Sequence, residues 1–151
     1  MPEYAGPRNA FTIQVPDDWT YDRGSPQEGE LDHLSFHNTV GGIGVLRLTA
    51  WALSDQPGAA EKFLARTQKL YAKPLRHETK IYDWIPVKNG FIRASQGAED
   101  GVPAWITLYV VVGRRCALMA SYVVALLRPK TPEDRVESEA VTKMILTATL
   151  T

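Results

Sequence analysis

Asp32, His33, Ser35 and His37 form the one local group in the sequence that combines an acid, a base and a hydroxyl. Such side chains could bind a metal ion or transfer protons if they converged on one point. The apolar residues that alternate with them predict a strand instead, in which His33 and His37 lie about 13 Å apart, too far to share one metal ion. We therefore favour the polar, solvent-facing side of a strand over a metal or catalytic site.

Two further reactive side chains lack a partner in the local sequence. His77 precedes Glu78, but neighbours in a strand point to opposite faces, so the two do not form a base with its orienting carboxylate. Cys116 follows Arg115, whose charge could lower the pKa of a thiol. Because no histidine lies near it in sequence, we favour a buried core thiol. The sequence thus predicts no catalytic residue, no metal site and no cofactor, and we expect the protein not to be an enzyme.

Composition bounds the class of protein. The 151 residues include 17 Lys plus Arg and 17 Asp plus Glu, and 44% are apolar, which is typical of a single globular domain over residues 1–151. A net charge of zero, with no run of Lys or Arg, argues against a nucleic-acid partner or a membrane surface. One cysteine excludes an internal disulfide.

Two segments bear on location. The first seven residues contain two prolines and an acid where a signal peptide needs basic and apolar residues, so we expect a cytoplasmic protein. The most apolar stretch, residues 105–127, is interrupted by Gly113, Arg114 and Arg115 and is too short for the roughly 20 residues of a membrane helix. We expect a hairpin there and no membrane insertion.

The first part of the chain has strand patterns. Residues 11–15, 31–37 and 43–50 alternate apolar and polar side chains, and the last two segments flank a glycine-rich turn, which predicts an antiparallel pair. Residues 20–30 contain glycine, serine and proline among acids and are predicted to form a loop.

Two helices are predicted, at residues 57–73 and 132–147. In the first, apolar residues recur at spacings of three and four, and Pro74 ends the pattern. In the second, Thr131 is a suitable cap and Pro132 suits the first helical position. Between the helices, Asn89 and Gly90 are the strongest hairpin signal in the chain.

The apolar stretch forms a hairpin with three aromatic residues on one face. If Gly113 and Arg114 are the turn, Trp105 faces Tyr122 and Tyr109 faces Leu118. The opposite face is aliphatic, so both strands belong in the middle of a sheet, and we expect both faces to be covered, one by a helix and the other by a second helix or a bound partner.

Trp105, Tyr109 and Tyr122 are the candidate binding residues, because aromatic side chains in a groove anchor ligands or partner segments. Core packing under a helix is the alternative, and we favour it. The predicted fold is α+β, with a single antiparallel sheet of about six or seven strands and two main helices packed on it.

The whole layout resembles the PsbP-like superfamily. The resemblance rests on the opening strand followed by residues 15–19 (Val-Pro-Asp-Asp-Trp), the helix at residues 63–71, the meander of strands and the final helix that runs into residues 144–150. The superfamily includes an extrinsic protein of the oxygen-evolving complex, a Ran-binding import factor and bacterial adaptors of type VI secretion. It implies a sheet sandwiched by helices that binds proteins without catalysis.

These observations give three hypotheses on function. The first is a bacterial, cytoplasmic, non-enzymatic module that binds another protein as an adaptor, chaperone or inhibitor. The alternative is a small-ligand binding protein that uses the aromatic sheet face. The third is a small enzyme built on residues 33–37 or on Cys116.

Overall fold

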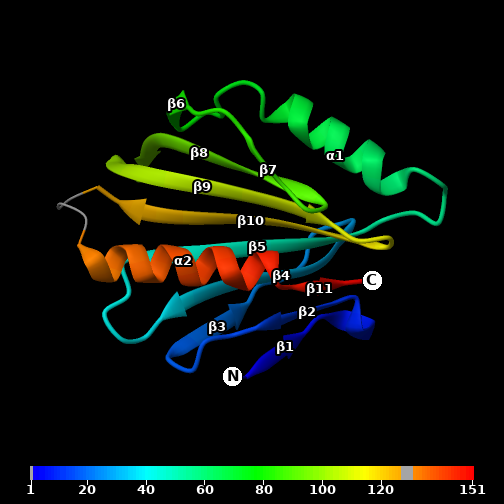
Figure 1. The fold of residues 1–151 in the computed structure, drawn as a ribbon, viewed down its shortest axis with the longest axis horizontal. Coiled ribbons are helices and arrows are strands. Elements are labelled where there is room, and N and C mark those ends of the chain that lie inside the picture. Colours follow the sequence, from blue (N-terminus) through cyan, green and yellow to red (C-terminus); the bar gives the residue numbers. More distant parts are fainter. Residues whose placement is uncertain (1, 127–130) are drawn as a thin grey trace.

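An eight-stranded antiparallel sheet forms the centre of the molecule (Figure 1). The computed structural model describes residues 2–126 and 131–151. Seven strands follow one another across the sheet, in the order β3 (Trp19–Arg23), β4 (Glu30–Asn38), β5 (Gly44–Ala52), β10 (Cys116–Ala125), β9 (Val102–Val112), β8 (Gly90–Glu99) and β6 (Glu78–Ile81). The eighth, β7 (Ile85–Val87), pairs with β8 beside β6.

A second, three-stranded sheet joins the two ends of the chain. β2 (Phe11–Gln14) lies between β1 (Glu3–Ala5) and β11 (Thr149–Leu150), and a short 3-10 helix, Pro7–Asn9, links β1 to β2. The α+β class and the antiparallel pairing are confirmed, but the expected single sheet of six or seven strands is wrong.

One of the additional strands is β3, in the segment expected to be a loop. Residues 19–23 pair with residues 34–38 of β4, and from Thr20 onward their side chains are exposed. An edge strand with little buried surface has no clear apolar alternation, so its pairing with β4 and not its own pattern defines it.

The two helices lie close to their expected bounds. α1 (Ala59–Leu70) begins after Gly58, which has a φ of 80°, and buries Phe63. α2 (Pro132–Leu146) is capped by Thr131, whose side chain accepts a hydrogen bond from the N–H of Asp134 while its backbone N–H donates to the Asp134 carboxylate. No helix of the described residues combines the length and apolar character needed to cross a membrane.

The helices cover opposite faces of the sheet. On one face Val141, Met144 and Ile145 of α2 pack into the larger core, and on the other Phe63 of α1 packs against Phe91 of β8 and its apolar neighbours. β9 and β10 contribute to both cores, as expected for strands in the middle of a sheet.

The β9–β10 hairpin differs from its expected register. Trp105 pairs with Val124 and Tyr109 with Ala120, and the turn is formed by Arg114 and Arg115. Because the shift is an even number of residues, each side chain stays on its expected face. Gly113 precedes the turn, where a Cβ would lie 2.5 Å from the backbone oxygen of Thr151. The last residue of the predicted apolar stretch, at position 127, lies outside the described residues.

Candidate functional site

The histidine-containing strand was correctly interpreted as having one polar side. His33, Ser35 and His37 lie on one face of β4, whereas Leu34 and Phe36 are fully buried on the other. His33 Nδ1 lies 3.2 Å from the hydroxyl of Thr49 on β5. Within residues 2–126 and 131–151, no three side chains of the metal-ligating types converge.

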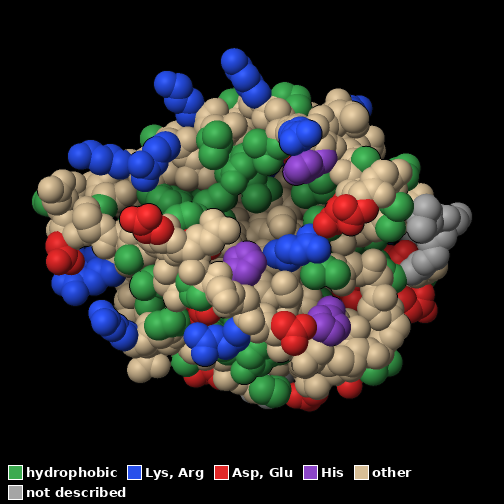
Figure 2. Space-filling view, turned by 180° about the vertical axis from the view of Figure 1, so that it is seen from behind, with side chains coloured by type: hydrophobic (Ala, Val, Ile, Leu, Met, Phe, Trp, Pro, Cys, Tyr) green, Lys and Arg blue, Asp and Glu red, His purple; other side chains and the backbone are tan. Residues whose placement is uncertain are grey.

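This face of the sheet is only partly covered by α1, and the uncovered part is hollowed. We call the hollow the open-face pocket; it has a volume of about 560 Å³. Its lining comes from β4, β5, β6, β8, β9, β10, the β8–β9 turn and the segment after α1, and consists of His33, Arg47, Thr49, Tyr71, Leu75, His77, Glu78, Arg93, Ala98, Glu99, Asp100, Ile106, Leu108, Met119, Ala120, Ser121 and Val123. Figure 2 shows apolar side chains inside the hollow, with histidine side chains and side chains of the Lys or Arg class around it.

The floor of the open-face pocket is aliphatic. Ile106 and Leu108 of β9 lie beside Met119 and Val123 of β10, on the face that the sequence predicted to be apolar. The sequence also predicted that both faces of this hairpin would be covered. α1 covers only part of this one, so an apolar surface remains accessible at the centre of the sheet.

One wall is held by a buried ion pair. Arg93 Nη2 lies 2.7 Å from both carboxylate oxygens of Glu78, and Arg93 Nη1 donates a 3.0 Å hydrogen bond to the backbone oxygen of Tyr71. Burial by itself raises the pKa of Glu78, but the nearby Ser95 hydroxyl, the N–H of Leu75 and Arg93 outweigh it and hold that pKa below its usual value. The charges of Arg93 and Glu78 therefore cancel each other, and the hydrogen bond from Arg93 to Tyr71 ties the segment after α1 to β8.

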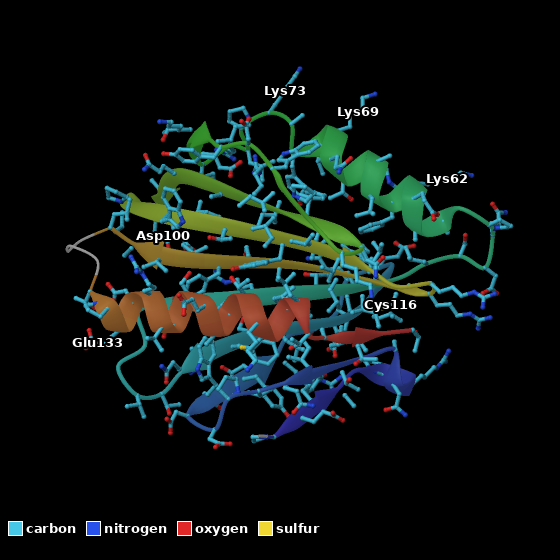
Figure 3. All side chains as sticks on the ribbon, viewed as in Figure 1. Lys62, Lys69, Lys73, Asp100, Cys116 and Glu133 are labelled. Carbon is cyan, nitrogen blue, oxygen red and sulfur yellow. The ribbon has the colours of Figure 1, made fainter. Side chains whose placement is uncertain are left out.

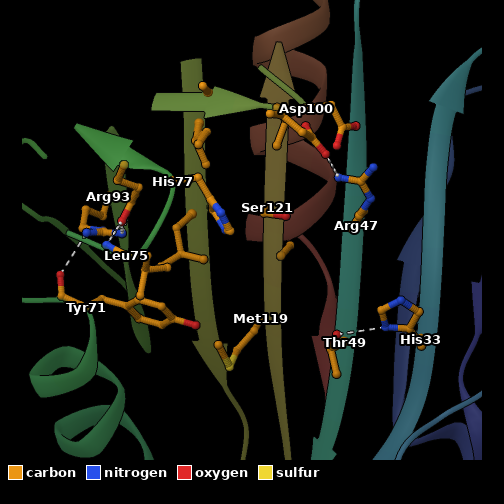
Figure 4. A pocket seen from close by; sticks show the side chains of 17 residues that line it. His33, Arg47, Thr49, Tyr71, Leu75, His77, Arg93, Asp100, Met119 and Ser121 are labelled. Atoms are coloured by element: carbon orange, nitrogen blue, oxygen red, sulfur yellow. Dashed lines mark hydrogen bonds and ion pairs between the residues drawn. The ribbon is translucent and has the colours of Figure 1, made fainter. Parts of the chain in front are cut away.

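The opposite wall is polar and more exposed. Arg47 forms a 2.8 Å ion pair with Glu99, and His33 lies beside Thr49. His77 stands between the two walls (Figure 4). The pocket thus combines an apolar floor with imidazole, guanidinium and hydroxyl groups at its rim.

The aromatic residues singled out in the sequence lie on the other face. Tyr109 and Tyr122 are each 1% exposed beneath α2, where the Tyr109 hydroxyl is 2.8 Å from Thr142 Oγ1 and the Tyr122 hydroxyl donates to Glu137. Burial raises the pKa of both phenols, and for Tyr122 the Glu137 carboxylate raises it further. In this conformation neither has surface with which to touch a partner.

Trp105 lies at the margin of that core. It is partly buried, and its ring packs against Tyr82 with 5.3 Å between ring centroids. Trp105 and Tyr122 also border a second pocket, of about 540 Å³, that α2 and the turn after β4 help to line. The structure therefore brings Tyr109 and Tyr122 together under one helix and leaves only Trp105 partly accessible.

Cys116 is the buried core thiol that was favoured. It is fully buried, and burial raises its pKa to about 11. The neighbouring Arg115 does not lower that pKa, because its guanidinium is directed to Asp55 at 3.5 Å. The thiol stays protonated near neutral pH and is a poor nucleophile.

The sequence analysis missed the open-face pocket for a physical reason. Its residues come from eight segments, and Arg93 and Glu78 are 15 positions apart, so no local spacing connects them. The signal that was available is the aliphatic face of β9 and β10, which is more extensive than one helix of twelve residues can cover.

Comparison with known proteins identifies the fold and not the function. No protein-family model matches the chain, and no curated protein matches its sequence. A crystal structure from Bacteroides thetaiotaomicron superposes with a TM-score of 0.66 at 14% identity, over 99% of this chain and 48% of that one. LpqN, described as involved in cell envelope biogenesis of Mycobacterium tuberculosis, gives 0.56 at 10% identity, over 93% of this chain and 83% of that one. The chain thus spans about half the length of the Bacteroides protein.

Proposed function

We propose that this chain is a non-catalytic binding module and that the open-face pocket holds a small ligand with an apolar body and a polar end. The observation that carries the proposal is the accessible aliphatic floor at the centre of the sheet. Its volume of about 560 Å³ falls in the range of small-molecule sites, roughly 300–1,000 Å³, which also combine apolar walls with a few polar groups.

The side chains at the rim of the open-face pocket determine which polar groups the ligand can carry. His33, His77 and Arg47 offer nitrogen donors, and Ser121 and Thr49 offer hydroxyls. Because Arg47 and Arg93 are both already paired with carboxylates, the pocket carries little uncompensated charge. Hydroxyl, carbonyl or amide groups on the ligand match this rim better than a strongly charged group.

The state of the reactive groups supports binding rather than catalysis. Glu78 is held as a carboxylate by Arg93, which makes it a poor general base, and the Cys116 thiol is buried away from the pocket. A cytoplasmic location and kinship with the PsbP-like superfamily remain part of the proposal. The sheet with helices on both faces supports that kinship.

A protein partner is the second candidate function. Trp105, beside α2, packs against Tyr82 on the sheet face that α2 partly covers. The same face carries Ile92 and Ile85, the second of which is 57% exposed. Partly exposed aromatic and aliphatic residues of this kind can anchor a partner protein. In this hypothesis Trp105 keeps its predicted binding role.

A fluorescence titration tests the ligand pocket. The probe is Nile red, an uncharged dye whose emission rises in apolar sites. We expect the wild-type chain to bind it at one site and Ser121→Phe, which fills the pocket, to weaken binding at least about tenfold, as loss of roughly 1.4 kcal/mol does. Ser35→Phe is the matched control, because Ser35 lies on the same sheet face but does not line the pocket.

Two results separate the candidates. Equal probe binding by Ser121→Phe, Ser35→Phe and the wild-type chain, all with native melting temperatures, would contradict the pocket. A protein that crosslinks to wild type and to Ser121→Phe but not to Trp105→Ala would favour the second candidate.

A further inference from the structure

A row of basic side chains runs along the outer side of α1. Lys62, Arg66 and Lys69 are spaced by four and three residues, which places them on one side of a helix, and Lys73 follows just after the helix ends. All four are exposed, whereas Phe63 and Thr67 on the other side are buried against the sheet. Figure 3 shows Lys62, Lys69 and Lys73 extending away from the body of the molecule.

The four cations of this basic row form no ion pair with any residue that the structure describes. The ion pairs among the described residues involve Arg23, Arg47, Arg93 and Arg115, and none involves a member of the row. Glu61 is the one acid of α1, and it too forms no ion pair with a described residue. The positive charge of the row is therefore available to a partner.

The net charge of the chain is zero, but its acidic and basic residues are concentrated in different segments. Residues 1–32 contain seven acidic and two basic side chains, a net charge of −5, whereas residues 59–93 contain eight basic and three acidic ones, a net charge of +5. Most of the first segment lies with the small sheet at the end of the molecule opposite α1 (Figure 1). The sequence analysis looked for an unbroken run of Lys or Arg and so missed a helical row.

We propose that the basic row docks the protein onto a membrane surface of anionic lipids. Each Lys or Arg held near such a surface strengthens binding roughly fivefold, so four together give several hundredfold. The three members on α1 span about 10 Å along the axis, and they can face a flat surface at the same time. The acidic pole is repelled by the same surface, and this repulsion sets the orientation of the molecule.

Leu70 distinguishes a lipid surface from other polyanions. It is the last residue of α1, borders the row and is 61% exposed. An apolar side chain beside cations gains from entering the boundary between head groups and acyl chains, but contributes nothing at a nucleic-acid backbone. Three of the four cations are lysines, which act as point charges and lack the fork that binds a single phosphate bidentately. The inference does not depend on the ligand of the open-face pocket.

Vesicle co-sedimentation tests the proposal. Vesicles of phosphatidylcholine mixed with phosphatidylglycerol should bind the wild-type chain, and vesicles of phosphatidylcholine alone should not. Replacing Lys62, Arg66, Lys69 and Lys73 together by glutamine should weaken binding by roughly a hundredfold or more. Leu70→Gln should weaken it severalfold, and added salt should release the wild-type chain.

The matched control removes four exposed cations elsewhere, by replacing Arg8, Lys88, Arg135 and Lys143 with glutamine. It has the same net charge as the first variant, and we expect it to retain binding within about threefold, because distant charges are screened. The proposal is overturned if the two variants lose binding equally, or if phosphatidylcholine alone binds as well. Tighter binding to duplex DNA or to polyglutamate than to the anionic vesicles would also overturn it.

Discussion

Arg93 holds Glu78 by one nitrogen, Nη2, which lies 2.7 Å from both carboxylate oxygens, and the two side chains are almost completely buried. Removing either partner leaves the other charged and without compensation inside the protein. We therefore expect Glu78→Gln to lower the free energy of unfolding by about 3–5 kcal/mol, as breaking a buried ion pair from one side does. Urea unfolding at neutral pH measures this.

The double variant Glu78→Leu with Arg93→Met is the control for that prediction. It removes both charges and keeps apolar volume, so its loss of stability should be smaller than that of Glu78→Gln. A loss below about 1 kcal/mol for Glu78→Gln would show that the ion pair contributes little.

The same ion pair predicts a dependence of stability on pH. The pKa of Glu78 is held below its ordinary value of 4.5 in the folded chain, so below that pH the unfolded chain takes up the proton first. The stabilisation is thus complete above about pH 4.5 and is lost as the pH falls through the folded pKa. The difference in unfolding free energy between wild type and Glu78→Gln should shrink on acidification. A difference that is constant from neutral to acidic pH would contradict it.

How far the sequence could predict this structure depends on the range of the interactions. The β7–β8 hairpin lies where Asn89 and Gly90 predicted it, because turn chemistry is local, but its two turn residues are Lys88 and Asn89, and Gly90 is the first residue of β8. β3 was missed because its pairing with β4, and not its own composition, defines it. The open-face pocket depends on how much of the sheet one helix covers, and the position of Glu78 beside Arg93 depends on the path of the chain between α1 and β6.

The aromatic face was predicted in its composition but not in its accessibility. Its even register shift kept Tyr109 and Tyr122 on one side, yet only the tertiary structure places α2 over them. The basic row is visible in the sequence when residues 62, 66, 69 and 73 are read at helical spacing, but only the fold shows that it forms no ion pairs within residues 2–126 and 131–151.

Trp105 and Tyr109 should respond differently to truncation. Tyr109 is 1% exposed under α2, so Tyr109→Ala should cost about 3–5 kcal/mol of unfolding free energy, as large core truncations do. Trp105 is partly exposed at the margin, and Trp105→Ala should cost less, roughly 1.5–3 kcal/mol. Chemical denaturation of the two variants under one condition makes the comparison. A larger loss for Trp105→Ala would show that Trp105 is the main aromatic residue of this core.

Gly90, which follows the turn between β7 and β8, could be required for its backbone angles or for lack of space for a side chain. Asn89 has a φ of 61°, whereas Gly90 is not in the positive-φ region, so the turn does not require glycine at position 90 for its backbone angles. A Cβ on Gly90 would instead lie 1.9 Å from the backbone oxygen of Val110 on β9, and the two strands would have to move apart. We expect Gly90→Ala to cost roughly 1–3 kcal/mol or more, as overpacking does. Asn89→Gly, which keeps the positive φ accessible, should change stability little. Thermal and urea unfolding of both variants measure this, and a Gly90→Ala chain as stable as wild type would mean that β9 does not approach the turn this closely in solution.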